Sequence, residues 1–169
     1  MSAADASAAA LYERHHGQLR RYLARFTGDP DLAADIAQDA FMRLLEQPPG
    51  HAMTGPWLFR VATNLALDAA RTRARRRTLV LEGRALRAHS DPPAPPDRRA
   101  ERAHARRVVN EALTALSEKE RMALLLREEG FAHREIAEAL GTTTGSVGTL
   151  LARALRKAAA RLGTTREDG

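Results

Sequence analysis

The chain has 169 residues, which is enough for one domain or two small ones. Its 27 Lys and Arg outnumber 21 Asp and Glu, and the net charge of +6 favours an anionic partner, either nucleic acid or an anionic membrane surface. The absence of cysteine excludes disulfides, zinc–cysteine sites and thiol redox chemistry. No apolar run approaches the roughly 20 residues of a membrane span, and acidic Asp5 and Glu13 stand where a signal peptide needs positive charge. We therefore expect a cytoplasmic protein without membrane insertion.

The N-terminal half is expected to form three helices. Apolar residues recur at three- and four-residue steps over residues 11–26, which predicts one helical face. Asp29 and Pro30 are typical of an N-cap and a first helical position, so a second helix begins there and ends before the following Pro-Pro-Gly run. A third helix is expected over about residues 57–77, ending in the basic cluster ARTRARRR. Residues 8–78 are interpreted as one helical domain.

A change of composition separates this domain from a second one. The run SDPPAPPD cannot be helical, so residues 79–103 are expected to form a flexible, Pro-rich linker. Helix resumes near Arg98, and Ser117 with Glu120 forms a capping box that starts a further helix. Residues 104–163 are interpreted as the second domain. The predicted fold is all-α, with an N-terminal helical bundle and a C-terminal helix-turn-helix domain on a flexible tether.

The segment HREIAEALGTTTGSVGTLLARALR, residues 133–156, has the layout of a helix-turn-helix. Ala137 is small where the second helix crosses, Gly141 suits a turn with positive φ, and Val147 packs the second helix onto the first. The second helix of such a pair commonly enters the DNA major groove. The alternative is a plain helical hairpin whose Thr run only caps a helix. The candidate DNA contacts are polar or basic: Arg134, Thr143, Thr144, Ser146, Thr149, Arg153 and Arg156.

Two more polar stripes repeat at helical spacing. One on the third helix suits phosphates and base edges, although a solvated basic face or a site for an acidic protein is the alternative. Its members are Arg60, Asn64, Asp68, Arg71 and Arg75. The other, on the second helix, is either a solvated face or a protein-docking surface. Its members are Asp35, Gln38, Asp39 and Met42, beside Phe41.

Signatures of enzymes and metal sites are missing from the sequence. The six histidines are scattered and mostly outside metal-ligand spacing, and neither GxxxxGK nor GxGxxG occurs. We therefore expect no catalytic residue, no metal and no cofactor.

Four motifs in order make the chain resemble the extracytoplasmic-function (ECF) group of RNA polymerase sigma factors of the sigma-70 superfamily, over nearly its whole length. DLAADIAQDAFMRLLEQ resembles the family's core-binding helix, and WLFRVATNLALDAARTRARRR resembles the helix that melts and reads the −10 element. LTALSEKERMALLLREEGFAHREIAEALG is similar to the start of the fourth region, and the helix-turn-helix resembles the reader of the −35 element.

The resemblance implies a role for each stripe. Asp35, Gln38, Asp39, Phe41 and Met42 fall where the family contacts the β′ coiled-coil of core polymerase. The third-helix stripe falls where the family binds the unwound −10 strand. The candidate contacts of the helix-turn-helix fall where the family reads the −35 element. The implied partners are core RNA polymerase, through the β′ coiled-coil and the β flap, promoter DNA and an anti-sigma factor. The implied location is the cytoplasm, in association with the nucleoid.

Departures from the family pattern gather in the recognition helix. Gly148 and Leu150 replace expected basic residues, and Gly148 costs roughly 1 kcal/mol of helix stability relative to Ala. Ala132 stands where a capping Ser is common, and Ser117 replaces a usual Pro. We expect weaker binding to the −35 element than is usual for the family.

Two other classes of protein stay open at this stage. A stand-alone helix-turn-helix regulator with an unrelated N-terminal domain predicts tight duplex binding by the isolated chain, whereas a sigma factor predicts weak binding until core is added. An antagonist or scaffold that sequesters another regulator predicts no promoter-specific transcription.

Overall fold

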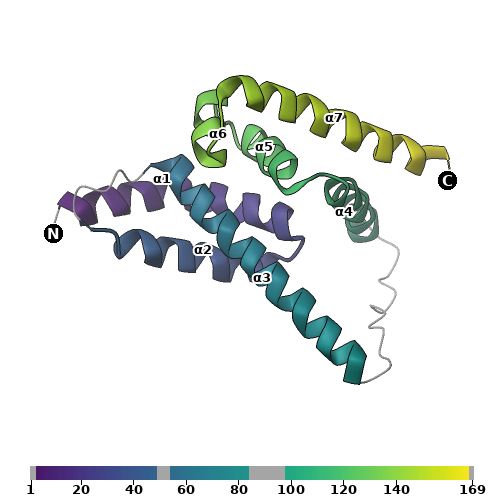
Figure 1. Cartoon of the computed structure of the whole chain (residues 1–169), viewed down its shortest axis with the longest axis horizontal. Helices are drawn as coiled ribbons and strands as arrows, with labels where there is room; N and C mark the ends of the chain where they lie inside the picture. The colour runs from purple at the N-terminus through teal and green to yellow at the C-terminus, as the bar shows by residue number, and fades with distance from the viewer. Residues whose placement is uncertain (1–2, 49–53, 84–97, 168–169) are drawn as a thin grey trace.

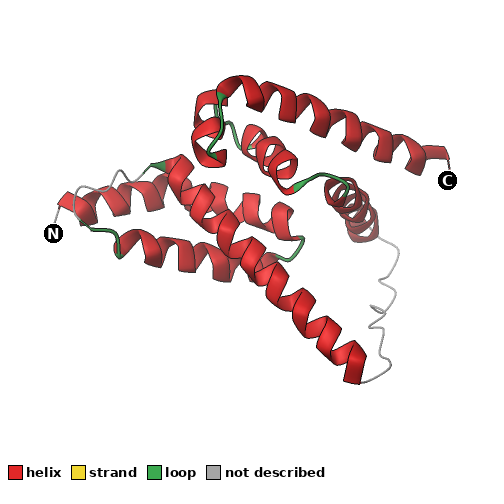
Figure 2. Cartoon of the chain, in the orientation of Figure 1, coloured by secondary structure: helices red, strands yellow, loops and turns green. Residues whose placement is uncertain are grey.

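The computed structural model describes residues 3–48, 54–83 and 98–167, and over these ranges it consists of seven helices and no strand (Figures 1 and 2). The expected all-α fold is confirmed. The N-terminal unit contains α1 (Ala3–Thr27), α2 (Pro30–Leu45) and α3 (Gly55–Gly83). The C-terminal unit contains α4 (Arg98–Thr114), α5 (Glu118–Glu128), α6 (His133–Leu140) and α7 (Thr144–Glu167). No helix within the described ranges is long and apolar enough to cross a membrane.

The core of the N-terminal unit lies where α1, α2 and α3 meet. Leu19 and Leu23 of α1 and Leu58 of α3 have no exposed surface. The buried Tyr22 hydroxyl lies 2.7 Å from the Thr63 hydroxyl, which in turn donates to the Phe59 carbonyl at 2.7 Å. Burial raises the pKa of Tyr22 far above its usual value, so its hydroxyl stays protonated. The buried Tyr22 hydroxyl is therefore not left without a hydrogen-bond partner, because Thr63 lies beside it.

Asp29 closes the turn between α1 and α2, as the sequence predicts. Its Oδ1 accepts from the backbone N–H groups of Asp31 (3.1 Å) and Leu32 (3.0 Å), with Pro30 in the first helical turn. Its Oδ2 accepts from Arg73 of α3 at 3.1 Å. The hydrogen bond from Leu32 and the guanidinium of Arg73 lower the pKa of Asp29, and the N-cap thereby also fastens α3.

The C-terminal unit begins with the predicted capping box. Ser117 Oγ accepts from Glu120 N (3.3 Å), and the Glu120 carboxylate accepts from Ser117 N (2.9 Å). Lys157 of α7 donates to both oxygens of Glu120 at 3.0 and 2.7 Å. Lys157, followed by the Ser117 backbone, lowers the pKa of this nearly buried carboxylate. One carboxylate therefore starts α5 and ties it to α7.

The helix-turn-helix forms as predicted. Gly141 ends α6 in the left-handed conformation (φ 62°), and Thr142 N donates to the Ala137 carbonyl at 2.9 Å. Val147 is fully buried against this turn. Ala132 offers no side-chain cap, but the Glu135 carboxylate accepts from its backbone N–H at 2.8 Å, so half of the capping box remains.

α3 extends beyond both of its predicted ends. α3 begins at Gly55 rather than Trp57, because Pro56 is tolerated in a first turn, where its missing N–H removes no hydrogen bond. It also runs to Gly83 rather than about Arg77, since TLVLE contains no helix breaker. α4 begins at Arg98, as the sequence predicts, and with the longer α3 it means that helix enters the predicted linker 79–103 from both sides. The Pro-rich run itself lies outside the described residues, as does most of the predicted loop before α3.

The C-terminal unit also packs directly on the N-terminal one, a contact that no local pattern in the sequence indicates. α5 contacts α1, and α6 contacts the start of α3 (Figure 1).

Candidate nucleic-acid and polymerase interfaces

The stripe predicted on α3 lies on one exposed face of that helix. Its members follow one another at steps of four, four, three and four residues, and each is exposed. Arg71 donates to Asp68 at 3.2 Å, which orients that guanidinium along the helix. The second half of α3 projects beyond the other helices (Figure 1). The stripe brings together the predicted residues Arg60, Asn64, Asp68, Arg71 and Arg75.

This surface has the chemistry needed for single-stranded or duplex DNA. The arginines can bind phosphates, and Asn64 can pair with the hydrogen-bonding edge of a base. Arg73 belongs to the same basic cluster but points to the other side, where it binds Asp29. The sequence does not separate this structural arginine from its neighbours, because only the fold places Asp29 beside it.

The predicted recognition surface on α7 is exposed as well. The Thr143 hydroxyl already has partners within the protein, since its Oγ1 accepts from Ser146 N at 3.3 Å and lies 2.9 Å from Ser146 Oγ. The capping role considered for the Thr run is therefore real for Thr143. Ser146, Thr149 and Arg153 follow along the outer face of the helix. The predicted members, all exposed, are Arg134 on α6, Thr143 just before α7, and Thr144, Ser146, Thr149, Arg153 and Arg156 on α7.

The two departures in α7 differ structurally. Gly148 faces open space, because a Cβ there meets nothing within 4 Å. Leu150 is half-buried and packs against the hydrophobic core. Of these two positions, only 148 has room for an exposed basic side chain that could reach DNA.

The four members of the predicted stripe on α2 are exposed, whereas Phe41, which the resemblance adds to them, is not. Asp35, Gln38 and Asp39 face solvent, and 52% of Met42 is accessible. Phe41 is 8% exposed and belongs to the core, because its ring packs edge-on against Tyr12 with centroids 4.8 Å apart. Phe41 follows buried Ala40 and precedes exposed Met42, so it lies at the border between the buried and the exposed face of α2.

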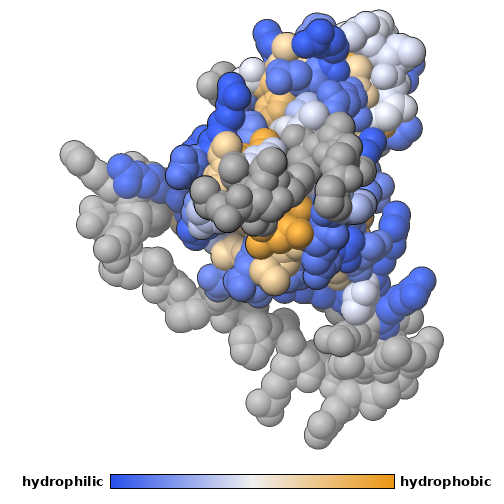
Figure 3. Space-filling view, turned by 90° about the vertical axis from the view of Figure 1, so that its left-hand side faces the viewer, coloured by the Kyte–Doolittle hydropathy of each residue, from blue (hydrophilic) through white to orange (hydrophobic). Residues whose placement is uncertain are grey.

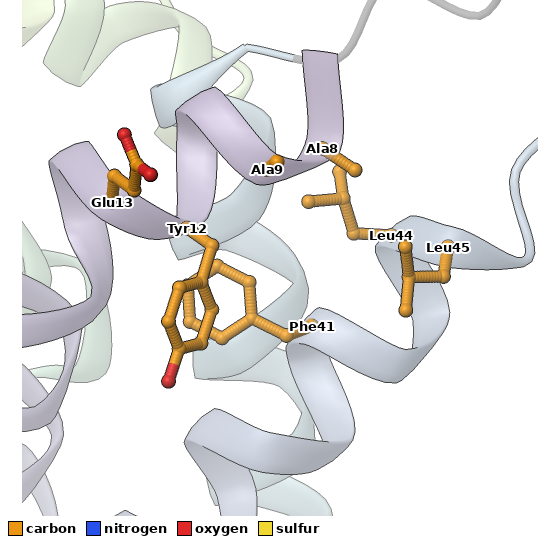
Figure 4. Close-up of a pocket in the computed structure, with 7 residues that line it drawn as sticks. All are labelled: Ala8, Ala9, Tyr12, Glu13, Phe41, Leu44 and Leu45. Carbon is orange, nitrogen blue, oxygen red and sulfur yellow. The ribbon is translucent and has the colours of Figure 1, made fainter. Parts of the chain in front are cut away.

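An apolar pocket of about 260 Å³ lies beside this stripe, between the start of α1 and the end of α2. Figure 3 views this end of the molecule and shows apolar residues within a largely hydrophilic face. Figure 4 shows the rings of Tyr12 and Phe41 next to each other, with Leu44 and Leu45 at the end of α2. No pattern in the sequence indicates this pocket, because its two walls come from different helices. It is lined by Ala8, Ala9, Tyr12, Glu13, Phe41, Leu44 and Leu45.

Within the described ranges, no group of three or more His, Cys, Asp or Glu residues could hold a metal ion.

The comparisons with known families agree with this arrangement. A model of sigma-70 region 2 matches residues 11–76, and one of sigma-70 region 4 matches residues 106–157. The two helical units are therefore regions 2 and 4 of a sigma-70 protein. The ECF RNA polymerase sigma factor SigL of Mycobacterium tuberculosis is 35% identical over 166 residues, covering 93% of this chain and 91% of that protein. The ferric citrate uptake sigma factor FecI of Escherichia coli is 31% identical over 148 residues, covering 86% and 84%.

Solved structures share the fold. The structure of CnrH in complex with the cytosolic domain of CnrY matches with a TM-score of 0.64 at 24% identity, covering 95% of this chain and 90% of that one. The sigma factor RpoE from Bartonella quintana, solved with the anti-sigma factor NepR, matches with a TM-score of 0.60 at 22% identity, covering 86% and 89%.

The chain belongs to the ECF RNA polymerase sigma factors. It is thus a transcription initiation factor with a helix-turn-helix, from a family not known as enzymes. The stand-alone regulator is not favoured, because region 2 is present beside region 4.

Proposed function

We propose that this chain is a dissociable promoter-specificity subunit, without catalytic activity of its own, that opens the −10 element with the exposed face of α3. One observation carries the proposal: five basic, amide and acidic side chains share one solvent-facing stripe, while the opposite face of α3 is buried in the core. A strand that leaves the duplex can be held there by phosphate contacts and base-edge hydrogen bonds. Melting is driven by this binding, with no nucleotide hydrolysis.

Residues 104–163 supply the second contact, on duplex DNA near the −35 element. α7 enters the major groove with its outer face, on which Ser146, Thr149 and Arg153 are accessible. The open surface at Gly148 makes this contact weaker than that of a helix with a basic residue there.

Core polymerase binds the exposed stripe on α2. Asp35 and Asp39 give this stripe negative charge, and Met42 adds an exposed apolar side chain at its end. This chemistry suits the β′ coiled-coil, while the C-terminal unit contacts the β flap. The protein acts in the cytoplasm at the nucleoid, where polymerase and DNA are.

An anti-sigma factor is the further partner we propose. RpoE of Bartonella quintana was solved with such a factor, and SigL, a relative at 35% identity, belongs to the same family as this chain. Co-purification of this chain with a candidate antagonist, and loss of transcription on its addition, tests the assignment.

The central test uses Asn64→Ala in reconstituted transcription with purified core polymerase on genomic promoter fragments. We expect promoter opening, followed by permanganate reactivity of unpaired thymines, to be lost while core binding is kept. Asp39→Arg on α2 is the complementary variant, with core binding lost and the fold kept, since both positions are exposed. Wild-type transcription by Asn64→Ala would overturn the −10 assignment.

A further inference from the structure

The turn between α1 and α2 has a well-defined backbone. Thr27 Oγ1 donates to the Leu23 carbonyl at 2.8 Å and accepts from Asp29 N at 3.1 Å. Gly28 adopts the left-handed conformation (φ 72°), and its N–H donates to the Ala24 carbonyl at 3.0 Å. These bonds fix the backbone on the α1 side of Asp29. The turn therefore presents the Asp29 side chain at one defined place.

The two carboxylate oxygens of Asp29 bind two different helices. Oδ1 accepts from the backbone N–H groups of Asp31 and Leu32, at the start of α2. Oδ2 accepts from Arg73 Nη1 of α3 at 3.1 Å. The Asp29 side chain is 35% exposed and that of Arg73 is 58% exposed. Because the α2 amides fix Oδ1, Asp29 offers Arg73 an acceptor whose position does not depend on Arg73 itself.

Arg73 lies in the part of α3 that the core no longer covers. Ala66 is buried, and Leu67 and Ala69 still pack against the core. From residue 70 to residue 75 every side chain is exposed, and this half of the helix projects beyond the other helices (Figure 1). The bond to Asp29 thus attaches α3 to the α1–α2 turn about one helical turn beyond its last core contact.

This attachment determines where two other arginines point. Arg71 and Arg75 each lie two residues from Arg73, which is a rotation of about 200° around the helix. With Arg73 directed to Asp29, both therefore point outward, on the stripe that also carries Asn64. Arg73 follows Asn64 by nine residues, or about 14 Å of helix. A tilt of about 10° over that length moves the arginines by about 2 Å, which is enough to break a hydrogen bond.

We propose that Asp29 is a positioning residue for promoter opening: through Arg73 it holds the exposed half of α3 in the direction that lets Arg71 and Arg75 bind the DNA backbone while Asn64 binds a base. The proposal rests on the assignment of α3 to the −10 element. Arg73 then acts through Asp29 and not by binding DNA. Because Asp29 also begins α2, the helix that carries the polymerase-binding stripe and the helix that opens DNA are aligned by one carboxylate.

The test removes the charge of Asp29 and keeps its cap. Asn is as good an N-cap as Asp, so Asp29→Asn preserves the start of α2 while it removes the ion pair with Arg73. Asp31→Asn is the matched control, since this exposed residue lies in the first turn of the same helix and loses the same charge. Both variants are assembled with purified core polymerase on genomic promoter fragments, and the rate of opening is followed by permanganate reactivity of unpaired thymines.

We expect Asp29→Asn to slow opening by about three- to tenfold, because the arginines must then be ordered during DNA binding. Asp31→Asn should open promoters at the wild-type rate, and both variants should bind core polymerase as the wild-type protein does. If Asp29→Asn opens promoters faster and steepens the salt dependence of binding, Arg73 binds a phosphate once it is released, and the proposal is wrong. Equal slowing by Asp31→Asn also overturns it, because general charge is then the cause.

Variants of Arg73 separate positioning from direct DNA contact. Arg73→Gln should slow opening as much as Asp29→Asn, and the double variant should be no slower than either, because both changes break one bond. Arg73→Lys keeps a cation opposite Asp29 and should stay within about twofold of the wild-type rate. Additive slowing in the double variant, with a salt slope lower by about 0.9 whenever Arg73 is replaced by Gln, indicates a phosphate contact and overturns the proposal.

Hydrogen exchange of the full-length free protein measures the attachment without DNA. Backbone amides of residues 70–75 should exchange faster in Asp29→Asn and in Arg73→Gln, and at the wild-type rate in Asp31→Asn. Unchanged exchange in Asp29→Asn overturns the attachment of α3 to the turn. Faster exchange with a wild-type opening rate overturns the positioning role, because the bond then serves the fold alone.

These outcomes separate from those of the proposed function. If Asn64→Ala transcribes normally while Asp29→Asn still speeds exchange in α3, the −10 assignment fails and the attachment remains a property of the fold. If Asn64→Ala loses promoter opening while Asp29→Asn changes neither exchange nor opening, the −10 assignment stands and the role of Asp29 is wrong.

Discussion

Gly148→Lys should strengthen promoter binding, because the structure offers open space and an outward direction at this position. A Cβ at Gly148 meets no atom within 4 Å, so the new side chain causes no steric conflict. Removing a glycine from the interior of α7 stabilises the helix by roughly 1 kcal/mol. A lysine that also reaches a phosphate should steepen the salt dependence of binding, with the slope of log K against log salt changing by about 0.9.

The assay separates these two effects. Holoenzyme made with each variant is titrated onto a fluorescent promoter fragment over a series of salt concentrations, and the thermal unfolding of the free protein is followed in parallel. Gly148→Ala is the matched control: it should raise Tm by about 2–4 °C and leave the salt slope as in the wild-type protein. Gly148→Lys should show a similar rise in Tm together with the steeper slope.

Two results would refute the reasoning. If Gly148→Ala strengthens promoter binding as much as Gly148→Lys, the missing charge is unimportant and helix stability sets the affinity. If Gly148→Lys gains thermal stability with an unchanged salt slope, the side of α7 that carries position 148 does not face DNA.

Three more outcomes are expected. Arg153→Ala should lower the salt slope of promoter binding by about 1, and an unchanged slope would remove it from the DNA contacts. Glu120→Gln should lower the free energy of unfolding in urea by about 1–2 kcal/mol. Lys157 lowers the pKa of Glu120 in the folded state, so the stabilisation by this carboxylate is complete above its ordinary pKa of about 4.3 and is lost as the pH falls through the lowered, folded-state pKa. The variant should therefore lose less stability in acid than the wild-type protein. An equal acid response would contradict this. Tyr22→Phe should cost about 1 kcal/mol, since Thr63 keeps its bond to a backbone carbonyl, and a loss of several kcal/mol would indicate a larger role for the hydroxyl.

Local signals explain what the sequence predicts well. The Asp29 cap, the capping box at Ser117 and the glycine turn at Gly141 depend on residues within a few positions of each other, and all three form. The exposed stripes on α2, α3 and α7 are also recovered, because helical periodicity alone determines which residues share a face. Phe41, which only the family resemblance adds to the polymerase contacts, is buried beside the α2 stripe, where Tyr12 packs against it.

The interface between the two units could not be predicted in this way. Gln18 and Arg21 look like a solvated face of α1, and their common partner Glu129 lies 111 and 108 residues further along the chain. Polar side chains at helical spacing are the usual pattern of a surface, so periodicity gives no sign that this one is covered. The predicted linker gives no geometric restraint either. Only the three-dimensional arrangement shows that the side of α1 facing away from α2 has a partner.

Polar and apolar contacts both contribute to that interface. Its ion pairs involve half-exposed arginines, which salt screens and which contribute little each. Its apolar part is chiefly the ring of Phe131, and the backbone at that position is held within the C-terminal unit by Leu126 and Arg127.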